Sequence, residues 1–247
     1  MESLSYESTS TAEFGDLISF AAGTRAIKTV TVAMSSWTCQ TYPCATTPGS
    51  SYPHPVTLNL YQVNTGATPT PGVLITTITD TFQIPFRPSP TGECGTGFTA
   101  PDDPKDGCTD GLAFTIEFDL KSVIVPNNII YGITYNTQSH GPNPTGIPGP
   151  ADSLNVAVTT AAATVGTNVN PDVVYWDTLL GDWYADGGAG GIGVFRADTG
   201  WNPYTVAIRF ATVAAPALTT EICKNGGHIA AGFRNLGQCI ASFNANK

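Results

Sequence analysis

The chain has 247 residues and a formal net charge of −9, and only 12% of its residues are charged. Nucleic acids and anionic membrane surfaces attract clustered Lys and Arg, so ten scattered basic residues argue against either as a partner. No segment has the roughly 18 apolar residues that a membrane-spanning helix needs, and we expect no membrane span. A surface of neutral polar residues is typical of extracellular proteins, and the length suits one large domain.

Alternating apolar and polar residues predict β-strands along most of the chain. Strands are expected near residues 17–21, 29–34, 56–61, 73–84, 112–120, 129–136, 153–159, 172–177, 192–196 and 204–211. The clearest strand places on one face Leu112, Phe114, Ile116, Phe118 and Leu120. Segments rich in Gly and Pro, such as 66–72 and 141–150, separate the strands. Together these patterns predict an all-β fold, a two-sheet antiparallel sandwich that is jelly-roll-like and has long, disulfide-stapled loops.

Six cysteines form three close pairs in the sequence, which predicts local disulfides and an oxidising compartment. The predicted bonds are Cys39–Cys44, Cys94–Cys108 and Cys223–Cys239, although other pairings are open. We therefore expect a sandwich domain at 1–215 and a small disulfide-closed tail at 216–247. Zinc binding is the alternative use of these cysteines. It is disfavoured because no pair has the CxxC spacing and the three histidines, His54, His140 and His228, do not cluster in the sequence.

Two segments resemble recurrent segments of uncharacterised secreted bacterial proteins. Residues 13–25 read EFGDLISFAAGTR and are similar to the line EFGD-x-I-x-x-A-G-T-x-R that opens their β-sandwich. Residues 223–239 are similar to a C-x-N-G-G…F-x-N-x-G-x-C tail, with His228 where Trp usually follows the glycines. The resemblance implies a secreted or cell-surface protein and carries over no catalytic residue.

An acidic loop lies around the end of the second cysteine pair. Its carboxylates belong to Asp102, Asp103, Asp106 and Asp110. Such hard oxygen ligands beside Gly107 and Gly111 could coordinate a structural Ca²⁺, although their spacing is not that of an EF-hand. The alternative is a solvated acidic loop without metal. No other cofactor is expected.

Aromatic and charged residues concentrate between 175 and 204. The candidate ligand-binding residues are Trp176, Trp183, Tyr184, Asp186, Arg196, Asp198 and Trp201. Aromatic rings stack on the apolar faces of sugars while carboxylates and Arg bind hydroxyl groups, so this group predicts a site for polysaccharide or a cell-surface glycan. The alternative is that the rings pack in the core at one end of the sandwich.

The sequence contains only weak matches to catalytic motifs. The GxGxxG match at 188–193 follows no buried parallel strand, and a GxSxG nucleophile motif is absent. Glu117 and Asp119 share the polar face of one strand and could serve a glycosidase, but a solvated strand face explains them as well. We therefore predict a secreted, noncatalytic cell-surface or extracellular-matrix module that binds carbohydrate. The alternatives are a self-assembling structural or filament subunit and a glycoside hydrolase.

Overall fold

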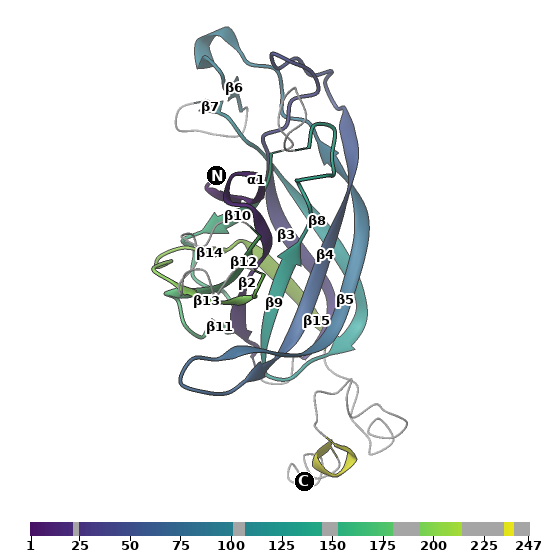
Figure 1. The fold of residues 1–247 in the computed structure, drawn as a ribbon, viewed down its shortest axis with the longest axis vertical. Helices are drawn as coiled ribbons and strands as arrows, with labels where there is room; N and C mark the ends of the chain where they lie inside the picture. The colour runs from purple at the N-terminus through teal and green to yellow at the C-terminus, as the bar shows by residue number, and fades with distance from the viewer. Residues whose placement is uncertain (22–24, 101–106, 145–152, 180–192, 214–234, 240–247) are drawn as a thin grey trace.

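A computed structural model of the chain describes residues 1–21, 25–100, 107–144, 153–179, 193–213 and 235–239. Two large antiparallel sheets account for most of it (Figure 1), which confirms the predicted all-β sandwich. Among these residues helix is limited to short segments such as α1 (Tyr6–Thr9) and the 3₁₀ turn η1 (Gly92–Cys94). No helix of the described residues is long and apolar enough to cross a membrane.

In the described part of the chain the first sheet has six strands. They are β1 (Ser3–Ser5), β10 (Leu154–Thr159), β14 (Thr205–Val206), β3 (Ala26–Ser36), β15 (Ile208–Val213) and β8 (Leu112–Ile124). The central strand is β3, because β8 pairs with it along its whole length while β10 and β15 share its other edge. The two terminal segments of the sandwich, β1 and β15, therefore belong to the same sheet.

The second sheet has seven strands within the described ranges. They are β13 (Arg196–Thr199), β12 (Val173–Thr178), β2 (Thr11–Ser19), β11 (Thr167–Asn168), β9 (Asn128–Thr134), β4 (Ser51–Asn64) and β5 (Thr70–Pro85). A separate two-stranded ribbon consists of β6 (Phe98–Thr99) and β7 (Cys108–Thr109). The chain changes sheets at successive connections, from β2 to β3, β3 to β4 and β8 to β9, as jelly rolls do.

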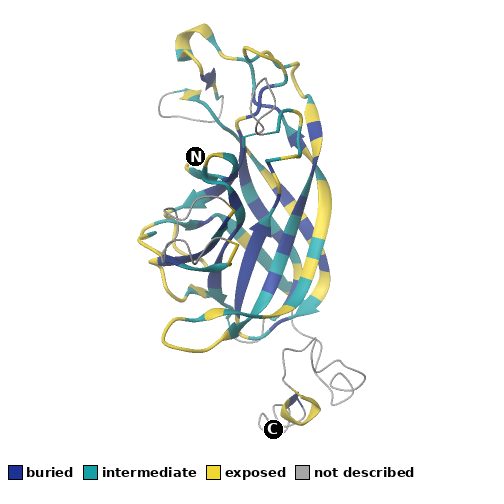
Figure 2. Cartoon of the chain, in the orientation of Figure 1, coloured by how far each residue is buried: buried dark blue, intermediate teal, exposed yellow. Residues whose placement is uncertain are grey.

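The main core lies between the two sheets. It contains inward side chains from both sheets, including Phe14, Val30, Val32, Met34, Leu58, Leu60, Ile116, Phe118, Ile133 and Trp176. Burial alternates along many strands, and Figure 2 shows this as bands of blue and yellow. In β8, Ile116 and Phe118 are buried while Glu117 and Asp119 are exposed, as period-2 alternation predicts.

Strand β2 differs from the expected strand for a simple reason. The strand predicted at 17–21 is β2 and begins at Thr11. Its outer face is covered by a second hydrophobic cluster that contains Leu17, Ile130, Val173 and Tyr175. A strand that is buried on both faces loses its alternation, so the sequence gives no period-2 signal for most of β2.

The predicted disulfides Cys39–Cys44 and Cys94–Cys108 are present, with Cα–Cα distances of 5.0 and 5.4 Å. Both close loops outside the two sheets. Cys239 is also disulfide-bonded, while its predicted partner Cys223 lies outside the described residues. Most of the predicted tail at 216–247 is likewise outside them, so the domain boundary and the third pairing remain predictions.

Candidate functional site

Three of the predicted ligand-binding residues form a packing unit instead of a stacking platform. Trp176 is only 4% exposed, and its Nε1 donates to Thr11 Oγ1 at 2.7 Å. Trp201 packs edge-on against Trp176 with 5.6 Å between ring centroids, and its Nε1 donates to Asp198 Oδ2 at 2.6 Å. Asp198 is itself buried. Alternation along β12 turns Trp176 into the core, which agrees with the alternative that this ring packs at one end of the sandwich.

The remaining residues of that prediction divide into two groups. Trp183, Tyr184 and Asp186 lie outside the described residues, and their ligand-binding role stays a prediction. Arg196 is half-buried at the start of β13, near Asp177. Burial raises the pKa of Asp177, and the backbone amides of residues 193 and 194 and the charge of Arg196 partly oppose that rise. Arg196 therefore serves at least as a counter-charge for a half-buried carboxylate.

The acidic loop is described only at Asp110, because Asp102, Asp103 and Asp106 lie outside the described residues. Asp110 pairs with Arg87 Nη1 at 3.8 Å. The guanidinium of Arg87 lies 5.6 Å from the ring centroid of Phe98 and donates to the carbonyl oxygen of Thr96. Asp110 thus helps to fix the β6–β7 ribbon to the sandwich. Within the described ranges no three potential His, Cys, Asp or Glu ligands form a group, and the calcium site stays a prediction.

A pocket of about 440 Å³ lies at the β1 edge of the six-stranded sheet. Its lining residues are Met1, Glu2, Ser3, Ser5, Trp37, Ser153 and Asn155, and we call it the Trp37 pocket. Strands β1 and β10 pair antiparallel here, with Ser5 opposite Asn155. Figure 1 places the N-terminus close to α1 and β10. The backbone nitrogen of Trp37 donates to the carbonyl oxygen of Ser153 at 2.8 Å, which fixes the segment after β3 at the pocket.

Trp37 is held by its polar edge and leaves part of its ring accessible. Its Nε1 donates to Ser35 Oγ at 3.1 Å. When the side-chain amide of Asn155 is oriented with its oxygen toward Trp37, this oxygen also accepts hydrogen bonds from Trp37 Nε1 at 3.1 Å and from Ser3 Oγ at 3.0 Å. Asn155 is 4% exposed, whereas Trp37 is 38% exposed. A Cβ on Gly111 would lie 2.5 Å from Trp37 Nε1, so the glycine makes room for this indole.

The Trp37 pocket combines the neutral polar side chains of Ser and Asn with the apolar surfaces of Met1 and Trp37, and Glu2 is its charged side chain. Hydroxyl groups and an amide exchange hydrogen bonds with sugar hydroxyls in either direction, and a partly exposed indole offers a surface for an apolar sugar face. Sequence reasoning missed this group because β1, Trp37 and β10 are far apart in the chain. The sequence feature that could have indicated this pocket is a Trp directly after an amphipathic strand and next to the Cys39–Cys44 loop.

A second pocket, of about 420 Å³, lies at the start of β4. Its lining residues are Tyr52, Pro53, Pro55, Thr81, Ser139, His140, Gly141 and Pro142. The ring of His140 contacts the ring of His54, with 4.7 Å between centroids. Burial, with a smaller contribution from the nearby His140, lowers the pKa of His54 to about 4. His54 and His140, which are far apart in the sequence, therefore lie side by side in space, while His228 lies outside the described residues.

The predicted carboxylate pair of a glycosidase lies on an open strand face. Glu117 and Asp119 are exposed and line neither pocket. Glu117 accepts from Thr31 Oγ1 at 3.1 Å, and Asp119 accepts from the Lys121 backbone nitrogen at 3.0 Å. This arrangement matches the solvated face that the sequence offered as the alternative.

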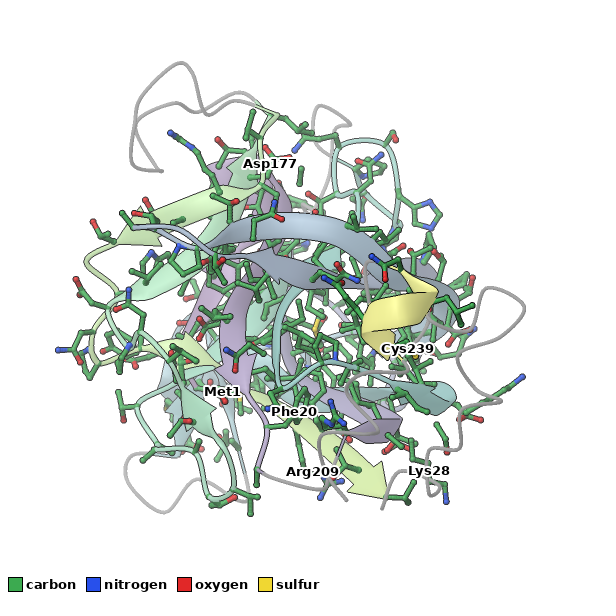
Figure 3. The ribbon with its side chains drawn as sticks, turned by 90° about the horizontal axis from the view of Figure 1, so that it is seen from below. Met1, Phe20, Lys28, Asp177, Arg209 and Cys239 are labelled. Atoms are coloured by element: carbon green, nitrogen blue, oxygen red, sulfur yellow. A yellow bond between two sulfur atoms is a disulfide. The ribbon has the colours of Figure 1, made fainter. Side chains whose placement is uncertain are left out.

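Buried carboxylates occur instead on the seven-stranded sheet. Glu13 accepts from Asn59 Nδ2 at 3.0 Å and from the Tyr61 hydroxyl at 2.9 Å. Its register partner on β12 is Asp177. Burial raises the pKa of Glu13, and the charge of Asp177 adds to that rise. Figure 3 shows Asp177 on the opposite side of the molecule from Lys28 and Arg209, which belong to the other sheet.

Comparison of the chain with family models, with curated proteins and with solved structures gives no match.

Proposed function

We propose that the protein is a secreted, noncatalytic module of the cell surface or extracellular matrix that binds carbohydrate in the Trp37 pocket. The observation that carries the proposal is a 38%-exposed indole in a pocket otherwise lined mainly by Ser and Asn side chains. The two disulfides between described residues lie in surface loops, which suits an oxidising environment outside the cell. A surface with few charges agrees with a neutral ligand.

The pocket is suited to binding more than to catalysis. Glu2 is the one carboxylate among its lining residues, whereas glycoside hydrolysis generally needs two carboxylates that flank the scissile bond. Trp37 is anchored at Nε1 by partners on β3 and β10, so its ring is positioned before a ligand arrives. A rigid aromatic contact of this kind reduces the entropy lost on binding.

The first test is a glycan array followed by titration of the best ligand with wild-type protein and Trp37→Ala. We expect Trp37→Ala to weaken binding by about 1–3 kcal/mol while the melting temperature changes little, because the ring is partly exposed. Tyr42→Ala is the matched control, since Tyr42 is 80% exposed and lines neither pocket. This control should bind as wild type does.

The outcomes of this test separate the open functions. If Trp183→Ala abolishes binding and Trp37→Ala does not, the ligand site is the loop that the sequence predicted. Release of reducing sugar ends would support a hydrolase. No glycan bound by any variant would refute the carbohydrate proposal.

A second candidate function, self-assembly, is favoured by the edge strand β5. Among the described strands it pairs only with β4, although it runs from Thr70 to Pro85. Near its start Val73 is 62% and Leu74 is 44% exposed. A long edge strand with exposed apolar residues is a template for pairing with another chain. Electron micrographs that show filaments for wild type and none for Val73→Lys would support this function. Monodisperse particles of wild type would contradict it.

A further inference from the structure

We propose that His54 and His140 form a two-imidazole binding site for a transition-metal ion of the Cu²⁺, Ni²⁺ or Zn²⁺ class. The two residues come from distant parts of the chain. His54 is on the core face of β4, and His140 lies in the segment that follows β9. The site is separate from the Trp37 pocket, so it does not depend on carbohydrate binding.

The distance between the two rings suits shared coordination. Imidazole nitrogens bind Zn²⁺ at about 2.0–2.1 Å, which brings the centroids of two adjacent imidazole ligands to roughly 4.5–5.2 Å for bond angles between square and tetrahedral. The observed centroid distance is 4.7 Å, with an angle of 86° between the ring planes. The pair therefore already has the separation that a common metal ion requires.

Surrounding aromatic contacts hold the ring of His54 in place. His54 lies edge-on between Tyr52 and Tyr135, with centroid distances of 6.0 and 5.8 Å. Tyr135 in turn stacks on Tyr6 at 3.9 Å, and its hydroxyl donates to the carbonyl oxygen of Leu154 at 2.9 Å. Aromatic packing thus fixes the position of His54 without a metal ion. Fixed ligands raise metal affinity because little conformational freedom is lost on binding.

The segment that carries His140 is closed by a side-chain turn. Asn136 Oδ1 accepts from the backbone nitrogens of Gln138 and Ser139 at 2.8 and 3.3 Å. Asn136 Nδ2 donates to Ser139 Oγ at 2.7 Å. These three bonds fix the residue directly before His140. By fixing Ser139, the turn helps to hold the imidazole of His140 against the buried imidazole of His54.

The neighbouring pocket gives access to the His140 side of the site, whereas His54 is fully buried and is not among the residues that line the pocket. His140 is half-buried and lines the 420 Å³ pocket together with Tyr52 and Ser139. Because no third His, Cys, Asp or Glu joins the pair among the described residues, water or an external ligand completes the coordination. Imidazole ligands favour Cu²⁺, Ni²⁺ and Zn²⁺ over the oxygen-preferring Ca²⁺ and Mg²⁺. This selectivity distinguishes the site from the calcium loop predicted around Asp110.

The test uses full-length protein with its disulfides intact, without a histidine tag and treated with chelator. Calorimetric titration with CuCl₂ should show one ion per chain, and the electron paramagnetic resonance spectrum should show coupling to two nitrogen nuclei. His140→Ala should weaken Cu²⁺ binding at least about tenfold, because even loss of a residue that only supports a ligand costs this much. His228→Ala is the matched control and should bind as wild type does.

His140→Ala is the decisive variant because His140 is half-buried and loop-borne, so the variant should fold, and its melting curve checks this. Unchanged Cu²⁺ affinity in His140→Ala would overturn the proposal. Cu²⁺ binding without nitrogen coupling, or the same loss of affinity in His228→Ala, would also overturn it. A His140→Ala variant that melts earlier while wild type binds no Cu²⁺ would show that the two rings serve packing alone.

Discussion

At the scale of a single residue, the buried carboxyl group of Asp16 joins several strands by hydrogen bonds. Its Oδ2 accepts from Thr205 Oγ1 at 2.7 Å and from Asn168 Nδ2 at 2.8 Å, and its Oδ1 accepts from the Leu17 backbone nitrogen at 2.7 Å. Burial nevertheless raises the pKa of this carboxyl from 3.8 to about 7. The residue connects β2 with β11 and β14, and so links the two sheets at one side of the sandwich.

We expect Asp16→Asn to change how stability depends on pH. Because the pKa is raised on folding, the stabilisation that Asp16 contributes is complete below its ordinary pKa and is lost as the pH rises through about 7. Between about pH 5 and about pH 8 the free energy of unfolding should therefore fall more steeply in wild type than in Asp16→Asn. Urea denaturation across this range measures both slopes.

The control for that prediction is Asp119→Asn, which alters an exposed carboxylate. The free energy of unfolding of Asp119→Asn should fall with pH as steeply as that of wild type. Equal slopes in wild type and Asp16→Asn would mean that Asp16 is ionised in the folded protein near neutral pH.

At the scale of an element, β8 shows how alternation sorts side chains between core and solvent. Phe118 is fully buried, lies opposite Val30 on β3 and packs edge-on against Phe82 with 5.1 Å between centroids. Phe118→Ala should lower the free energy of unfolding by about 3–5 kcal/mol, because a cavity replaces the ring. Glu117→Ala, one residue away on the solvent face, should change it by less than about 0.5 kcal/mol. Chemical denaturation of both variants measures these two changes. A large decrease in the free energy of unfolding of Glu117→Ala would show that Glu117 is more than a surface residue.

The elements also differ in how well their sequences indicate them. Strands with one solvated face, such as β8 and β4, alternate clearly. In contrast, β2 and β9 are buried on both faces and pack closely at Gly15 and Gly132, which lie directly opposite each other. A Cβ on Gly15 would lie 1.8 Å from the Tyr131 carbonyl oxygen. The reason for this glycine is visible only once the partner strand is known.

For the whole molecule, the two described disulfides lie in loops while the core lies between the sheets. We expect denatured, unreduced protein to show no free thiols in a titration. Reduction should lower the melting temperature, since closing a loop the size of Cys94–Cys108 contributes roughly 3 kcal/mol. The β-sheet signal in circular dichroism should survive reduction at room temperature. Loss of that signal would mean that the disulfides, and not the core, maintain the sandwich.

The sequence by itself determined the all-β class, the inward face of β8 and two disulfides, because each depends on neighbours close in the chain. It could not separate Trp37, which is partly exposed, from Trp176, which is buried. Nor could it bring His54 next to His140 or Ser3 next to Asn155. These placements depend on strand register and on which sheet each strand joins. Only the tertiary structure decides them, because hydrogen-bonded pairing and packing act between residues that are distant in sequence.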